Sequence, residues 1–139
     1  MEKIWLKNYP PGVPAEINPD AYQSLVEIFE KSCLHYPDHA ALYGLGTTLT
    51  YQQLDELSRD FAAYLQNKLN LVKGDRIAIM LPNILQYPIA LFGALRAGLV
   101  IVNVNPLYTA DEVAHQLHDA EASAIIVLAN FANTLEKAL

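Results

Sequence analysis

The residues best suited to hold a metal ion are two histidines in the last third of the chain. His115 and His118 are three positions apart in a predicted helix, with Asp111 and Asp119 beside them. A spacing of three puts both imidazole rings on one side of a helix. Zinc sites use three or four protein ligands, and no further fixed ligand accompanies this pair. The signal is weak, so we assign no metal-binding residue.

The sequence lacks the patterns that nucleophilic catalysis and nucleotide binding require. Cys33, the one cysteine, lies near the end of a predicted helix, where a cysteine most often packs as a small hydrophobic residue. The sequence has no GxGxxG or Walker-type loop, no GxSxG and no visible Ser-His-Asp arrangement. We therefore assign no catalytic and no cofactor-binding residue.

Asparagines gather where the predicted strands end. They are Asn83, Asn103, Asn105 and Asn130. Asparagine suits helix caps and turns. Alternatively these side chains line a ligand crevice, because ligands of open parallel sheets bind beyond the carboxyl ends of the strands. Those ends carry no glycine cluster and no lysine, so they are poor sites for a nucleotide phosphate.

A strand–helix–strand unit at residues 73–108 is expected to position the side chains at the strand ends. Apolar, β-rich runs at 76–80 and 100–104 predict buried strands, and the run 83–97, closed by Gly98, predicts a helix between them. Such a unit gives two parallel strands with a right-handed crossover. Pro88 conflicts with a helix from Asn83, since it would cost a hydrogen bond. Either the helix is kinked there or it begins later.

The flanking segments complete an alternating pattern. Capping-box sequences at Ser24, Thr50 and Thr109 predict helices that reach about residues 36, 68 and 120. The other predicted elements are a hairpin with strands at 40–43 and 47–49, a strand at 123–128 and a helix at 130–139. This alternation predicts an α/β fold with a layered, mostly parallel sheet and flanking helices. The charged stripe of the second helix is expected to face solvent; it consists of Asp55, Glu56, Arg59 and Asp60.

We divide the chain into an N-terminal arm, residues 1–21, and an α/β portion, residues 22–139. The arm holds four prolines within residues 1–19, which favour extended backbone and block helix. Trp5, between Lys3 and Lys7, either docks the arm onto the body or anchors it at a membrane interface, where tryptophan and lysine are favoured.

Composition excludes several classes of protein. The chain has 139 residues, 53% of them hydrophobic and 17% charged, which argues against disorder. Its net charge is −6, and the nine Lys and Arg residues are scattered, which argues against a nucleic-acid partner. One cysteine permits no internal disulfide. No signal peptide and no apolar stretch of about 20 residues is present. We expect a cytoplasmic protein.

Three motifs resemble the adenylate-forming enzymes, a superfamily that includes the acyl-CoA synthetases. They are LTYQQL at 49–54, KGDRIAIMLPN at 73–83 and LRAGLVIVNVNP at 95–106. The resemblance covers residues 22–139. The arm and VNVNPLYT, at 102–109, are more similar to the bacterial long-chain fatty-acid–CoA ligases than to the peptide synthetases.

This resemblance implies the N-terminal part of the superfamily's large domain. It also implies a two-step ligase that uses MgATP to convert a long-chain fatty acid to an acyl-adenylate and then forms a thioester with coenzyme A. The superfamily's phosphate loop and its other catalytic motifs follow the segment that these 139 residues match. We therefore expect an inactive N-terminal fragment with no bound cofactor. It would self-associate, and the arm could contact the inner face of the cell membrane. The alternative is a self-contained, non-enzymatic α/β module that binds a ligand or a protein.

Overall fold

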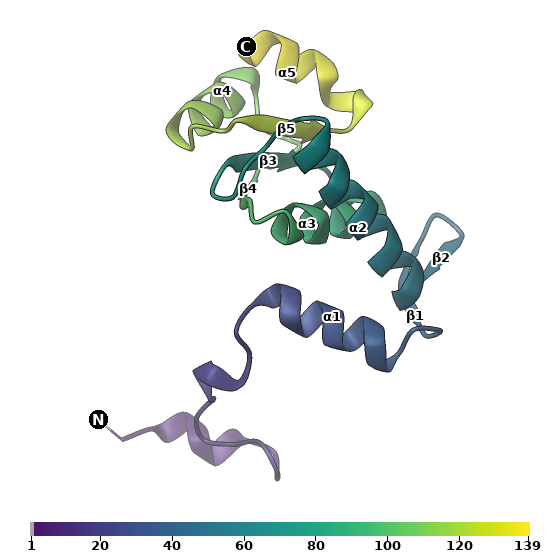
Figure 1. Cartoon of the computed structure of the whole chain (residues 1–139). Helices are drawn as coiled ribbons and strands as arrows, with labels where there is room; N and C mark the ends of the chain where they lie inside the picture. The colour runs from purple at the N-terminus through teal and green to yellow at the C-terminus, as the bar shows by residue number, and fades with distance from the viewer. Residues whose placement is uncertain (1) are drawn as a thin grey trace.

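A three-stranded parallel sheet lies between two layers of helices in the computed structural model, which describes residues 2–139 (Figure 1). In spatial order the strands are β4 (Val100–Asn103), β3 (Arg76–Met80) and β5 (Ala124–Val127). The helices that cover the sheet are α2 (Tyr51–Asn67), α3 (Gln86–Arg96), α4 (Ala110–Asp119) and α5 (Ala132–Ala138). The predicted α/β class, with a parallel sheet and flanking helices, is confirmed.

The strand order explains why the helices lie on opposite faces. The chain moves from β3 to its neighbour β4 through α3, then back past β3 to β5 through α4. Since both crossovers join parallel strands, each is expected to be right-handed, and crossovers running in opposite directions then put their helices on opposite faces. Figure 1 shows α2 and α3 on one face and α4 and α5 on the other.

The central strand is buried on both faces. Ile77 packs with Leu65 and Ala94 in the layer of α2 and α3. The next residue, Ala78, packs with Val113 of α4 on the opposite face. This alternation follows from the two-residue period of a strand, and burial on both faces explains why residues 76–80 form a nearly continuous apolar run.

A third layer lies over α2 and α3. It consists of α1 (Leu25–His35) and the antiparallel hairpin of β1 (Ala40–Gly44) and β2 (Thr47–Thr50). Phe29 of α1 stacks on Phe92 of α3 with 3.8 Å between the ring centroids. Cys33 and Leu54 are buried in the same cluster. Helix α1 therefore packs against the two central helices through Phe29 and Cys33.

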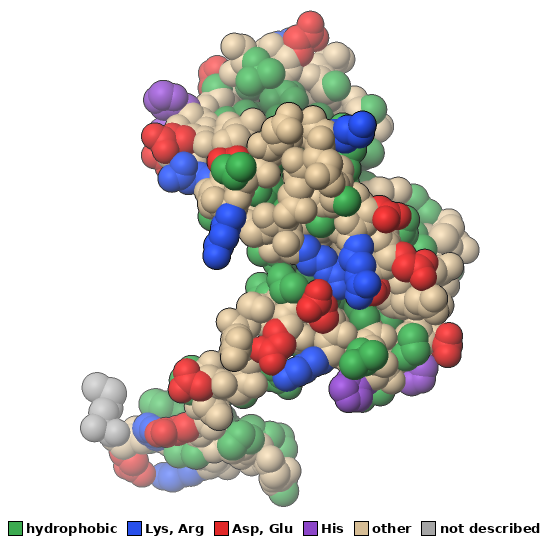
Figure 2. Space-filling model, in the orientation of Figure 1, with side chains coloured by type: hydrophobic (Ala, Val, Ile, Leu, Met, Phe, Trp, Pro, Cys, Tyr) green, Lys and Arg blue, Asp and Glu red, His purple; other side chains and the backbone are tan. Residues whose placement is uncertain are grey.

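A charged network also joins this third layer to the central helices. Arg96, only 7% exposed, pairs with Asp55 of α2 and lies 3.3 Å from Glu30 of α1. Its Nη1 donates to the Asp55 carbonyl and to the Ser58 hydroxyl, each at 2.8 Å. Figure 2 shows acidic and basic side chains side by side where α1 meets the body. The prediction that Asp55 faces solvent is wrong, because Arg96 from α3 covers it; its side chain is 17% exposed.

Helix starts follow the local signals, with one difference. Thr50 and Thr109 form complete capping boxes with Gln53 and Glu112, as predicted. At α1 the Ser24 side chain accepts from the Glu27 backbone, but Glu27 accepts from the Gln23 backbone in place of a reciprocal bond. Each cap satisfies N–H groups that have no partner within the helix.

Helix α3 begins later than predicted, at Gln86. Pro88 is its third residue and therefore lies in the first turn, where a missing N–H costs no intrahelical bond. This resolves the conflict over Pro88 in favour of a later start. Other boundaries differ by a residue or two: β1 and β2 each extend one residue beyond the predicted end, β4 ends at Asn103, and β5 spans only Ala124–Val127. In addition, the 3-10 helix η3 (Ala129–Phe131) precedes α5.

The N-terminal arm extends away from the body (Figure 1). It contains two 3-10 helices, η1 (Ile4–Asn8) and η2 (Pro19–Ala21), so the expectation that prolines block all helix is wrong there. The prolines do not fall within the η1 run, which leaves its backbone N–H groups available. Trp5 is 49% exposed and lies outside the buried clusters of the described residues. Within residues 2–139, every helix is too short or too polar to cross a bilayer.

Candidate functional site

An apolar crevice opens at the carboxyl end of the sheet, between β3 and β5. The chain leaves β3 toward α3 on one face and leaves β5 toward α5 on the other. Adjacent strands whose following segments diverge in this way leave a crevice, which is the usual ligand position in open α/β sheets. Its volume is about 540 Å³, within the range of small-molecule sites.

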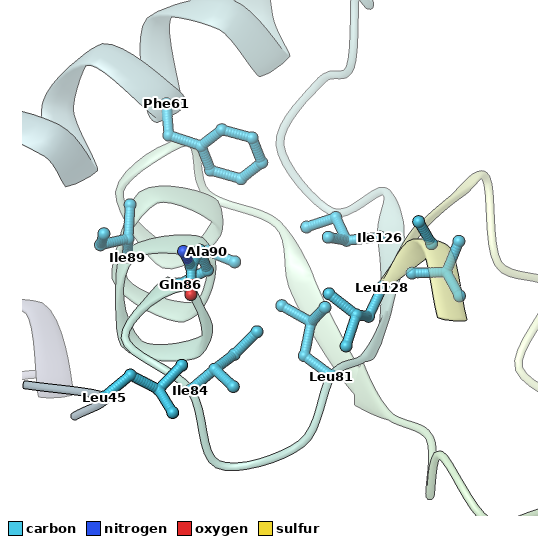
Figure 3. Close-up of a pocket in the computed structure, with 11 residues that line it drawn as sticks. Leu45, Phe61, Leu81, Ile84, Gln86, Ile89, Ala90, Ile126 and Leu128 are labelled. Carbon is cyan, nitrogen blue, oxygen red and sulfur yellow. The ribbon is translucent and has the colours of Figure 1, made fainter. Parts of the chain in front are cut away.

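Four segments of the chain line this crevice (Figure 3). Leu81, Ile84 and Ala90 come from the end of β3 and from α3, and Ile126 and Leu128 from β5 and the turn after it. Phe61 of α2 closes one side. The full set is Leu45, Phe61, Leu81, Ile84, Gln86, Ile89, Ala90, Ile126, Val127, Leu128 and Ala129.

The lining determines what the crevice can do chemically. None of its eleven residues is titratable, and Gln86 supplies the only polar side chain. It can therefore bury apolar surface, but it offers no acid, base, nucleophile or cation. A triphosphate would need glycine-rich backbone or paired cations, and the loops after β3, β4 and β5 have neither glycine nor lysine. These residues do not fit MgATP.

Leu45 is a lining residue that sequence analysis missed. It lies at the tip of the hairpin, is 97% exposed and has a φ of +51°, a backbone region that suits glycine better than leucine. A leucine between Gly44 and Gly46 in a turn is the signal that was available. Phe61 is spaced along its helix as a residue of a buried face would be, and it also closes one side of the crevice.

The four asparagines divide between the two interpretations. Asn105 accepts from the Leu107 backbone at 3.0 Å, which is turn chemistry. Asn103 accepts from the Tyr87 hydroxyl at 2.9 Å and so links β4 to α3. Asn83 lines the smaller hollow beside the hairpin, whereas Asn130 is exposed and lines neither this hollow nor the crevice.

The other candidate groups lie away from the crevice. His115 and His118 are both exposed on α4. Within residues 2–139, no three His, Cys, Asp or Glu side chains come together as a metal site would require. Burial, followed by the nearby Asp55 carboxylate, raises the pKa of the Cys33 thiol. The thiol therefore stays protonated at neutral pH, and Cys33 packs as a small hydrophobic residue.

Comparison with known proteins places these features in a family. The AMP-binding enzyme family matches residues 29–139. The chain belongs to this family. It is 61% identical, over 137 residues, to the long-chain-fatty-acid–CoA ligase of Salmonella typhimurium, covering 99% of the chain and 24% of that relative.

Solved structures agree with the family assignment. A benzoate CoA ligase from Burkholderia xenovorans superposes with a TM-score of 0.77 at 26% identity, covering 81% of this chain and 23% of that one. VinN, solved with L-aspartate, superposes with a TM-score of 0.79 at 31% identity, covering 85% of this chain and 34% of that one. The AMP-binding fold and the resemblance to adenylate-forming enzymes are thus confirmed, and the chain spans about a quarter of its curated relatives.

Proposed function

We propose that the protein to which these residues belong is an ATP-dependent long-chain fatty-acid–CoA ligase. It activates the fatty acid to an acyl-adenylate and transfers the acyl group to coenzyme A. The observation that supports this proposal is 61% identity across 99% of the chain with a relative named for that activity. Family membership also disfavours the alternative of an unrelated, non-enzymatic module.

Within that enzyme, residues 22–139 are proposed to be scaffold. Their part is to hold a parallel sheet and its apolar crevice, while segments outside these residues bind MgATP and coenzyme A. The lack of glycine and lysine in the loops at the carboxyl end of the sheet supports this division. So does the crevice lining, which has no titratable side chain.

Exchange of radiolabelled pyrophosphate into ATP, driven by palmitate, tests the division. The 139-residue chain should give no exchange above a protein-free blank, whereas a chain of the relatives' full length should exchange. The matched control is the full-length chain without palmitate, which reports exchange that does not depend on the fatty acid. Robust palmitate-dependent exchange by the pure 139-residue chain would contradict the proposal that the catalytic groups lie elsewhere.

We also propose that the 139-residue chain self-associates. A further proposal is a cytoplasmic location, with contact to the inner face of the membrane through the arm. The exposed Ile4 and Trp5 beside Lys3 and Lys7 support the membrane contact, because aromatic and basic side chains favour that interface. Pelleting with anionic lipid vesicles tests it: Trp5→Ala should reduce the bound fraction. Equal pelleting of the two proteins would exclude the anchor. No nucleic-acid partner is proposed.

A further inference from the structure

The two edges of the three-stranded sheet are not equally protected. At the β4 edge, Gln116 of α4 donates its Nε2 to the Asn103 carbonyl at 2.9 Å. The Tyr87 hydroxyl also donates to the Asn103 side chain, and Pro106 follows soon after the strand. Within residues 2–139, β5 pairs only with β3. The outer edge of β5 therefore presents backbone groups without a neighbouring strand, which favours pairing with another strand.

The sequence along β5 also favours such pairing. Residues 123–131 contain no charged side chain, and Ile125, Ile126 and Val127 are β-branched. All four residues of β5 are only half-buried. Natural proteins commonly protect an edge strand with lysine, proline or a bulge, and β5 contains neither lysine nor proline.

The crevice is bordered by the same strand. Ile126 and Leu128, at the end of β5 and just beyond it, face the crevice together with Phe61 and Ile84 (Figure 3). A strand added outside β5 would therefore satisfy the open backbone groups and extend the apolar surface that Ile126 and Leu128 begin beside the crevice. Main-chain pairing and apolar burial would stabilise the same contact.

We propose that the 139-residue chain forms a two-fold dimer through the outer edge of β5. The β5 strands of two copies pair antiparallel and join the two sheets into one of six strands. A two-fold axis perpendicular to the sheet keeps each face continuous, so Ile126 of each copy lies on the crevice side of the joined sheet. Such an interface is self-complementary and closed. The inference rests on the self-association in the proposed function and names its surface.

Charge and chain length favour a second copy as the occupant. Each chain carries a net charge of −6, but the residues from 123 to 131 bring no like charges together at the contact. The curated relatives are about four times longer, since the chain covers 24% of them, so polypeptide that could lie here in a longer protein is not part of these residues. The arm lies beyond α1, away from β5 (Figure 1).

Introducing a lysine at each end of β5 tests the proposed dimer interface. Ser123→Lys with Ala129→Lys changes two exposed positions that flank the strand. The matched control is Val100→Lys with Leu107→Lys, at positions 49% and 84% exposed on or near β4. By sedimentation equilibrium, the wild type and the control should form dimers of equal affinity. The β5 variant should dimerise at least about tenfold more weakly.

A wild-type chain that stays monomeric at all concentrations would overturn the proposal, as would equal weakening by both lysine pairs.

Hydrogen exchange on the unmodified chain gives a second readout that needs no variant. Protection of the β5 amides that point away from β3 should rise with protein concentration, while that of the 100–103 amides stays constant. Protection that does not depend on concentration would also overturn it. Neither measurement involves ATP or fatty acid, so failure here is distinct from failure of the ligase assignment.

Discussion

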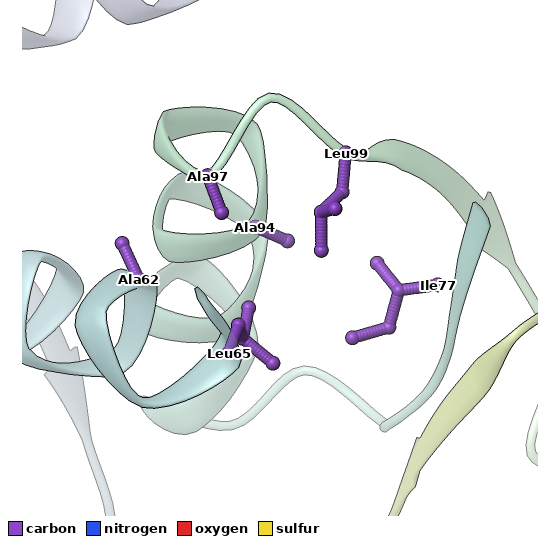
Figure 4. Close-up of a cluster of buried hydrophobic side chains, with 6 residues drawn as sticks. All are labelled: Ala62, Leu65, Ile77, Ala94, Ala97 and Leu99. Carbon is purple, nitrogen blue, oxygen red and sulfur yellow. The ribbon is translucent and has the colours of Figure 1, made fainter. Parts of the chain in front are cut away.

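Apolar packing covers both faces of β3, but the side of α2 and α3 also carries a buried charged network in its outer layer. On one face, α2 and α3 bury an apolar cluster against the sheet (Figure 4) and bind α1 on their outer side through Arg96. On the other face, α4 and α5 pack through an apolar cluster that includes Met80 and Val113. The ion pair on that side, Arg76 with Glu121, has side chains that are 45% and 77% exposed.

The two sides therefore differ in how precisely they fix the positions of the elements that pack together. Apolar packing stabilises both faces, but it is non-directional. The Arg96 guanidinium requires acceptors at fixed positions, and it finds them on α2 and on α1. The side with the charged network should therefore be sensitive to single polar changes as well as to side-chain volume. The α4 and α5 side should depend on apolar packing and on the hydrogen bonds that cap α4.

The largest effect is expected from Arg96→Ala. It leaves the Asp55 carboxylate, with its side chain only 17% exposed, without its main partner. It also removes a cation 5.0 Å from the Phe29 ring. Removing one partner of a buried pair costs about 4 kcal/mol. Urea unfolding followed by circular dichroism should show a loss of this order in the free energy of unfolding.

Two further variants sharpen the comparison. Arg59 also pairs with Asp55, but its side chain is 66% exposed, so Arg59→Ala should cost less than about 1 kcal/mol. Arg96→Met combined with Asp55→Leu removes both charges and should recover much of the stability. Equal losses for Arg59→Ala and Arg96→Ala would show that burial does not give Arg96 its special role.

A smaller loss is expected from Gly93→Ala, on the same face. A Cβ at this position would lie 2.9 Å from the Ser58 carbonyl oxygen and 2.8 Å from Phe61, so α2 and α3 would have to move apart. Overpacking of this kind costs about 2 kcal/mol. Helix propensity alone predicts a gain of about 1 kcal/mol. The sign of the change in urea unfolding therefore decides between close helix contact and propensity, and a stabilised variant would contradict the contact.

Local signals in the sequence predicted the elements well. The capping boxes at Thr50 and Thr109 involve residues three apart, so the sequence contains all the information needed to place them. The apolar run of β3 likewise depends on the strand alone. The start of α3 was placed too early because an apolar run does not show where hydrogen bonding begins.

Contacts between distant residues were not predicted. Asp55 was assigned to solvent because its partner, Arg96, is 41 residues away and belongs to another helix. The lining of the crevice was missed for the same reason, since Leu45, Phe61 and Ile126 come from a hairpin, a helix and a strand. The asparagines at the strand ends indicated the correct end of the sheet, but apolar side chains make up most of the crevice lining.

The smallest effect concerns two surface glutamates, one near each face. Backbone and side-chain hydrogen bonds from Thr109 lower the pKa of Glu112 at the start of α4. The hydrogen bond from Lys31, and then that from the Gln23 backbone, lower the pKa of Glu27 on α1. A pKa lowered in the folded state adds stability above the ordinary value of 4.5, and this stability is lost as the pH falls through the folded value. Glu112→Gln and Glu27→Gln should therefore each reduce stability at neutral pH and match the wild type in acid.

Salt should separate the two glutamates. Glu27 depends mainly on an exposed charged partner, Lys31, so added salt should screen its contribution. Glu112 depends on neutral donors of Thr109, so its contribution should persist. Urea unfolding of both variants and the wild type, at low and high salt and at neutral and acid pH, measures these differences. Salt could instead remove the stabilisation from Glu27 and that from Glu112 equally. The Glu112 cap of α4 would then depend on charge as strongly as the Glu27–Lys31 pair of α1 does. The two sides of the sheet would in that case not differ at their surface glutamates.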